Sequence, residues 1–102
     1  MFCVMVVYPN KDGVQFDFEY YIKKHIPMVS GHLGANLVKV EVRQGITSIS
    51  ESIQPFVCVS TLRINSVEEF HSAMNEHGKE IMGDIPNYTN AEPIIQIDEV
   101  IE

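Results

Sequence analysis

The segment FDFEYYIKKHIP, residues 16–27, is the most informative stretch of this chain. The spacing of its apolar side chains predicts an amphipathic helix that Asp17 can cap. His25 falls on the apolar face of this helix, one turn after Tyr21, and Pro27 follows two residues later. Because proline removes one backbone hydrogen bond, we expect the helix to kink or thin near His25. A histidine on an apolar face needs a polar partner or a cavity, so this segment is the first place to look for chemistry.

The remaining chain divides into strand-like runs and a second helix. The first helix is expected to end around Gly31 and Gly34. A capping box formed by Ser66 and Glu69 opens the second helix, and Gly83 is a suitable C-terminal stop. The runs 1–8, 37–44, 56–64 and 93–101 are expected to be strands, and the polar stretch 45–55 a loop.

This order, β-α-β-β-α-β, predicts an α+β fold, the ferredoxin-like sandwich, as a single domain over residues 1–102. Such a fold has a four-stranded antiparallel sheet with both helices on one face, the first and third strands in the centre. These two strands are apolar on both faces, whereas residues 37–44 alternate between apolar and charged. Two helices cover only one face of the sheet, so we expect a second copy to cover the other. The sequence therefore predicts a homodimer, a dimeric α+β barrel.

Charge and composition exclude several classes of partner. The 102 residues include 14 acidic and 7 basic side chains, for a formal net charge of −7, so we expect neither nucleic acid nor membrane as a partner. The apolar N-terminus lacks the basic start and cleavage site of a secretory signal and is too short to span a bilayer. Cys3 and Cys58 show no metal-binding spacing, so we expect two reduced thiols and a cytoplasmic location.

Several short motifs in a fixed order point to a known family. They are Tyr8-Pro9, Phe16-Asp17, Tyr20-Tyr21, Lys24-His25-x-Pro27, Ser66-Val67-Glu68-Glu69-Phe70, Gly83-Asp84-Ile85-Pro86-Asn87-Tyr88-Thr89, Pro93 and Gln96-Ile97. With these motifs the chain resembles the EthD family of small dimeric α+β barrel proteins over nearly its whole length. The resemblance implies the same fold, a homodimer, and a role as an oxidoreductase in small-molecule catabolism. Relatives with this barrel include lactone isomerases, polyketide cyclases, monooxygenases and haem enzymes.

His25 and Asp84 are the candidate catalytic residues. In the expected topology, the second half of helix one, the end of helix two and the loop 84–90 lie at the same end of the sandwich. His25 can then act as general acid and base, with Asp84 fixing its tautomer. The resemblance also places a histidine at this position, and a lactone-isomerising relative uses one there. Two alternatives stay open: a core histidine bonded to a free carbonyl, and an Asp84 that only caps the turn after Gly83.

Five further residues are candidates for binding substrate: Tyr8, Tyr21, His77, Asn87 and Tyr88. For the tyrosines the alternative is an aromatic core whose hydroxyls reach polar partners. No cofactor is predicted; haem-binding relatives hold iron through a histidine on the second helix, but apart from His77 nothing in the sequence favours haem. The four histidines show no HxxxH pair or matched carboxylate, so no metal site is expected, and His32 and His71 are expected to be solvated.

These residues suggest an enzyme that acts on a small, largely apolar, oxygen-bearing and possibly aromatic molecule held between helices and sheet. His25 would move a proton in an oxidation, an isomerisation or a cyclisation. The alternative is a non-catalytic accessory protein that binds a hydrophobic catabolic intermediate. Both need an apolar cavity with few polar groups.

Overall fold

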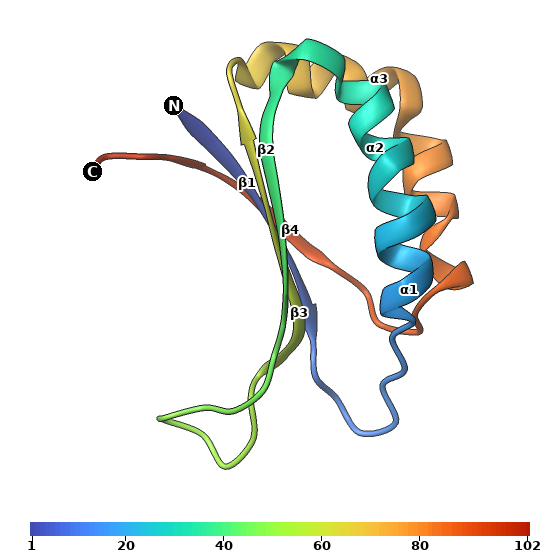
Figure 1. The fold of residues 1–102 in the computed structure, drawn as a ribbon, viewed down its shortest axis with the longest axis vertical. Helices are drawn as coiled ribbons and strands as arrows, with labels where there is room; N and C mark the ends of the chain where they lie inside the picture. The colour runs from blue at the N-terminus through green and yellow to red at the C-terminus, as the bar shows by residue number, and fades with distance from the viewer.

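The computed structural model describes residues 1–102 and has the predicted order of elements (Figure 1). Its strands are β1 (Phe2–Pro9), β2 (Leu37–Gln44), β3 (Phe56–Ile64) and β4 (Ile94–Glu99). Its helical elements are α1 (Phe18–Tyr20), η1 (Tyr21–His25), α2 (Ile26–Leu33), η2 (Gly34–Asn36), α3 (Val67–Gly83) and η3 (Ile85–Asn87). The four predicted strands are confirmed, each within two residues of its expected ends.

The sheet has the order β2-β3-β1-β4, and every neighbouring pair is antiparallel. The two strands predicted to be apolar on both faces, β1 and β3, occupy the centre. All helices lie on one face of the sheet, and the other face is uncovered (Figure 1). This is the predicted ferredoxin-like arrangement.

The first helical segment runs without a break from Phe18 to Leu33, but its hydrogen bonding changes on the way. The Asp17 carboxylate accepts a hydrogen bond from the backbone N–H of Tyr20 (3.1 Å), as a helix cap should. Tyr21 to His25 then form a π-turn, in which the N–H of Ile26 bonds to the carbonyl of Tyr21.

Two details of this segment differ from the expectation. The helix is disrupted near His25 as expected before Pro27, but it widens into a π-turn with one extra residue and does not thin. Gly31 lies inside α2, and only Gly34, with a φ of 56°, ends the helix.

Half of the predicted capping box of α3 is present. The Ser66 hydroxyl accepts from the N–H of Glu69 (3.1 Å). The N–H of Ser66 donates to the side chain of Asn36 (2.8 Å), which takes the place expected of the Glu69 carboxylate. Asn36, which is 7% exposed, thereby connects the end of the first helical segment to the start of the second.

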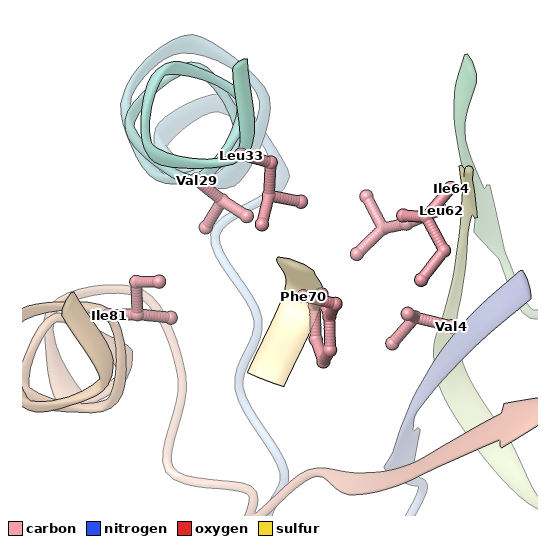
Figure 2. Packing of buried hydrophobic residues seen from close by; sticks show 7 residues of the cluster. All are labelled: Val4, Val29, Leu33, Leu62, Ile64, Phe70 and Ile81. Carbon is pink, nitrogen blue, oxygen red and sulfur yellow. The ribbon is translucent and has the colours of Figure 1, made fainter. Parts of the chain in front are cut away.

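The core between helices and sheet has two parts. Figure 2 shows the aliphatic part, in which side chains of α2 and α3 point toward those of β1 and β3 across a layer that includes Phe70. Its buried members are Val4, Val29, Leu33, Leu62, Ile64, Phe70 and Ile81. The second part is largely aromatic and includes Tyr21 of the π-turn. Its buried members are Tyr8, Tyr21, Cys58, Ile85 and Tyr88. The π-turn therefore lies beside the aromatic part.

The uncovered face of the sheet has an apolar centre and charged edges. Since Val4 and Tyr8 face the helices, alternation along β1 places Met5 and Val7 on the uncovered face. The register pairs Val7 with Val59, so the apolar surface continues onto β3. On this face the edge strands carry Lys39, Glu41, Arg43 and Asp98, and Arg63 lies near one end of the central strand β3. None of the helices has the length and apolar character needed to cross a bilayer.

Candidate active site

His25 and Asp84 form a close pair between the two helical segments. His25 Nδ1 lies 2.9 Å from Asp84 Oδ2, although the residues are 59 positions apart in the chain. The imidazole is 4% exposed, at the end of the π-turn, and Asp84 follows the last residue of α3. The topology therefore brings together the two residues that were predicted to be catalytic.

The Asp84 carboxylate is held by three side chains. Besides His25, Tyr20 Oη donates to Oδ1 (2.7 Å) and Asn87 Nδ2 donates to the same atom (2.9 Å). Burial alone raises the pKa of Asp84, but the hydrogen bonds from Asn87, Tyr20 and His25 outweigh burial and hold this pKa below its ordinary value. The alternative that Asp84 only caps a turn is wrong, because all three partners of its carboxylate are side chains.

This arrangement defines the tautomer of His25. Asp84 is ionised at neutral pH, so its Oδ2 accepts a hydrogen bond from Nδ1–H, and the lone pair of a neutral imidazole lies on Nε2. Nε2 has no hydrogen-bond partner in the chain, and no buried polar side-chain atom lacks a partner, so Nε2 reaches accessible space. The pair thus presents a free basic nitrogen.

A small apolar cavity, lined in part by His25, lies between the helices and the sheet. Its volume is about 50 Å³, and 13 of its 15 lining residues are hydrophobic. His25 and the rings of Tyr8 and Tyr21 are part of the lining. Met82 and Ile95, which also line it, are 44% and 42% exposed, so the mouth of the cavity lies between the end of α3 and β4.

Aromatic rings fix the imidazole from two sides. The Tyr21 ring, one turn before His25, stacks on it at a centroid distance of 5.4 Å and an interplanar angle of 14°. The Tyr88 ring lies 4.7 Å from it at 54°. Tyr21 Oη bonds to Ser60 Oγ (2.6 Å), and Tyr88 Oη bonds to Tyr8 Oη (2.7 Å). The rings thereby hold His25 in one orientation.

The three tyrosine hydroxyls of this cluster stay protonated at neutral pH. Burial is the largest cause that raises the pKa of Tyr8, Tyr21 and Tyr88 above its ordinary value. They are therefore hydrogen-bond donors and ring surfaces and do not act as bases at neutral pH.

Not every residue predicted to bind substrate lines the cavity. Tyr8 and Tyr21 do, but Tyr88 packs behind the imidazole, and Asn87 faces an open groove and supports Asp84. His77 lies outside the cavity, because α3 turns it toward α2, where it stacks on His32 at 3.8 Å. Sequence reasoning missed Tyr20, although it adjoins Tyr21 in the same motif.

His32 was expected to be solvated, but it is only partly so. Its side chain is 22% exposed, and its Nε2 lies 3.1 Å from Glu80 Oε1. Sequence spacing also indicated no carboxylate matched to a histidine. In the structure, His25 and His32 each have a carboxylate partner across the helix interface. Local spacing missed these partners because they lie on a different helix.

Fold and site together define a ferredoxin-like α+β protein with a histidine–aspartate pair beside an apolar cavity. An EthD-like protein from Ralstonia eutropha JMP134 is 39% identical, with 99% of this chain and 92% of that chain covered and a TM-score of 0.91. The chain belongs to the EthD family.

Two more distant structures share the fold. An ethyl tert-butyl ether D (EthD) family protein from Bacillus halodurans C-125 is 17% identical, with 99% of both chains covered and a TM-score of 0.67. A protein from Shewanella loihica PV-4, described as a candidate monooxygenase, is 11% identical, with 99% and 94% covered and a TM-score of 0.63. No protein-family model matches the chain, and no curated protein sequence does.

Proposed function

We propose that this protein is an enzyme that moves a proton on a small, largely apolar, oxygen-bearing molecule, with His25 as the proton-transfer residue. One observation carries this proposal: a buried imidazole that lines an apolar cavity has its Nδ1 held by Asp84, which leaves Nε2 without a partner in the chain. A base in such a setting needs no reorganisation before it accepts a proton.

In the proposed reaction, Nε2 of His25 takes a proton from the substrate and later returns it. The resulting imidazolium would be stabilised by Asp84, which Tyr20 and Asn87 keep in place. Tyr8 and Tyr21 would contribute ring surface to the bound molecule. This chemistry completes an isomerisation. In an oxidation of the kind that the EthD family suggests, His25 would supply only the deprotonation, and the electrons of the deprotonated substrate would pass to a separate oxidant such as O₂.

The cavity limits the size of the substrate. A volume of about 50 Å³ compares with roughly 10–15 Å³ for one buried water and with 300–1,000 Å³ for a drug-sized ligand site. A substrate larger than a few heavy atoms would enter by moving Met74 and Met82, flexible side chains in the lining. We therefore expect a small metabolite.

Deuterium exchange tests this function with a panel of probe molecules. Small ketones, lactones and phenols would be incubated with the protein in D₂O, and NMR would report binding and C–H exchange separately. We expect exchange with the wild type, and a loss of about 100-fold or more in His25→Ala with binding retained. His71→Ala, an exposed histidine on α3, is the control.

The opposite pattern would contradict the enzyme proposal. Binding of a probe to the wild type without exchange, and equal binding by His25→Ala, would favour the accessory protein that only holds an intermediate. Exchange that is unchanged in His25→Ala would remove the assigned base.

We also propose that the active form is a homodimer in which two uncovered sheet faces pack together. The chain exposes 6619 Å², whereas a monomeric protein of 11.6 kDa exposes about 5,800 Å². The difference is near the roughly 800 Å² that one partner contributes to a standard interface. Exposed isoleucines on the segments that extend past this face, in the loop 45–55 and at the C-terminus, favour the same conclusion (Figure 1): Ile46, Ile49, Ile53 and Ile101.

Sedimentation velocity would test the dimer. Val59→Lys places a charge at the apolar centre of the uncovered face and is expected to shift the protein to a monomer. Ile22→Lys, on the opposite helical side and 52% exposed, should leave the dimer intact. A wild-type monomer at micromolar concentration would contradict the proposal.

A further inference from the structure

A second group of metal-ligating side chains lies on the interface between the helices, outside the cavity and the His25 pair. His32 comes from the end of α2, while His77 and Glu80 come from α3. One nitrogen of each histidine and one oxygen of Glu80 all lie within 4.8 Å of one another. The candidate active site uses none of the three.

From this juxtaposition we infer a binding site for a divalent transition metal, with Zn²⁺ as the expected ion. Two imidazole nitrogens and one carboxylate oxygen are the ligand set of open, four-coordinate zinc sites, where water completes the coordination. A harder cation such as Mg²⁺ or Ca²⁺ prefers oxygen ligands, so two histidines select against it.

The backbone already places the ligands close to the required geometry. Zinc–ligand bonds near 2.1 Å put tetrahedral ligand atoms roughly 3.4 Å apart. His32 Nε2 and Glu80 Oε1 are 3.1 Å apart. His77 and Glu80, three residues apart on α3, share one helix face. The rings of His32 and His77 are stacked with their centroids 3.8 Å apart, so at least one ring would turn when both nitrogens bind one ion.

Burial at the site suits a metal that is taken from solution. The histidine side chains are 22% and 29% exposed and that of Glu80 is 59% exposed, so two ligands are sheltered and one is open. A second carboxylate, Glu76, has its Oε2 3.7 Å from His77 Nε2. With a net charge of −7 for the chain, the surroundings favour a cation.

Bound zinc would connect α2 to α3. The same interface carries the pair between His25 and Asp84 one turn further along α3, so a metal here would also stabilise the spacing of the two helices at the candidate active site. That role is separate from the proposed chemistry, which requires no metal at His32.

The test is zinc binding by the intact protein, measured by dialysis with metal analysis and by calorimetry with ZnCl₂. We expect one Zn²⁺ per chain in the wild type and a weakening of at least about tenfold in His32→Ala and in His77→Ala. His71→Ala, on the same helix but outside the cluster, should bind like the wild type. His25→Ala should also keep its zinc, which separates this site from the proposed active site. Circular dichroism would confirm that each variant is folded.

Glu80→Gln keeps the size of the side chain and removes its charge, so it should weaken binding while leaving the fold intact. Co²⁺ should give the d–d absorption of a four-coordinate site in the wild type and lose it in His77→Ala. The inference is overturned if the wild type binds no zinc. It is also overturned if binding is the same in His32→Ala and His77→Ala as in the wild type, because the contact between His32 and Glu80 would then serve only to hold the helices together.

Discussion

The buried pair of hydroxyls on Tyr8 and Tyr88 allows a quantitative test of how the aromatic part of the core is stabilised. The two oxygens are 2.7 Å apart, and the residues are 1% and 3% exposed. Replacing Tyr88 by Phe removes one partner and leaves the Tyr8 hydroxyl buried without it. Such a group costs about 1–3 kcal/mol. Replacing both tyrosines removes the hydrogen bond without leaving a hydroxyl unpaired, so it costs less than the sum of the single changes.

The expected shift in melting temperature follows from the size of the chain. Unfolding entropy near 2.1 cal/mol/K per residue gives about 0.21 kcal/mol/K for 102 residues. Each single variant should therefore melt about 5–14 °C below the wild type. Urea unfolding followed by circular dichroism at one fixed protein concentration would supply the free energies, so that a change in association does not enter the comparison.

A double-mutant cycle tests whether the hydroxyls of Tyr8 and Tyr88 depend on each other energetically. A coupling energy of about 1 kcal/mol or more between Tyr8→Phe and Tyr88→Phe is expected. Tyr20→Phe, whose hydroxyl bonds to Asp84, is the control and should add to Tyr8→Phe within about 0.5 kcal/mol. If the Tyr8 and Tyr88 changes are simply additive, the hydroxyls do not depend on each other and the reasoning fails.

Three further predictions concern single sites. The pKa of Asp84 lies below its ordinary value, so the ionised carboxylate stabilises the folded state. This contribution to the free energy of unfolding should be complete above about pH 4 and be lost as pH falls through the folded-state pKa. Urea unfolding curves of the wild type and Asp84→Asn should therefore converge at low pH. Gly45→Ala should destabilise by about 1–3 kcal/mol, since its Cβ would meet the Phe56 carbonyl oxygen, whereas Gly83→Ala, with open space, should not. Burial raises the pKa of Cys58 to about 11, so about 0.1% is thiolate at pH 8; iodoacetamide should modify it in urea but not in the native protein.

The strands and most helix ends were predictable because their signals are local. The run 37–44 alternates between apolar and charged residues, and its observed ends are the predicted ones. Asp17 and Ser66 were recognised as caps because a cap acts within three residues of itself. The π-turn was not predicted, because its extra residue is accommodated by the packing of Tyr21 and His25 and leaves no mark on apolar spacing.

Pairings across the helix interface were predictable only where topology alone sufficed. The strand order places the end of α3 beside the middle of the first helical segment, and this was enough to bring Asp84 near His25. It was not enough for His77, which was expected to reach the cavity. The rotation of α3 about its axis turns it toward His32 instead, and that rotation depends on side-chain packing along the whole helix.

The interface between α2 and α3 thus carries two histidine–carboxylate pairs, and burial separates their roles. His25 is 4% exposed, it lines an apolar cavity, and its partner Asp84 is held by two further donors. Only molecules that lose their hydration and enter the apolar cavity can reach a base in that position. His32 and Glu80 lie closer to solvent, with a second histidine beside them, where a hydrated ion can exchange its waters for protein ligands. The same pair of side-chain types therefore suits proton transfer in one place and metal binding in the other.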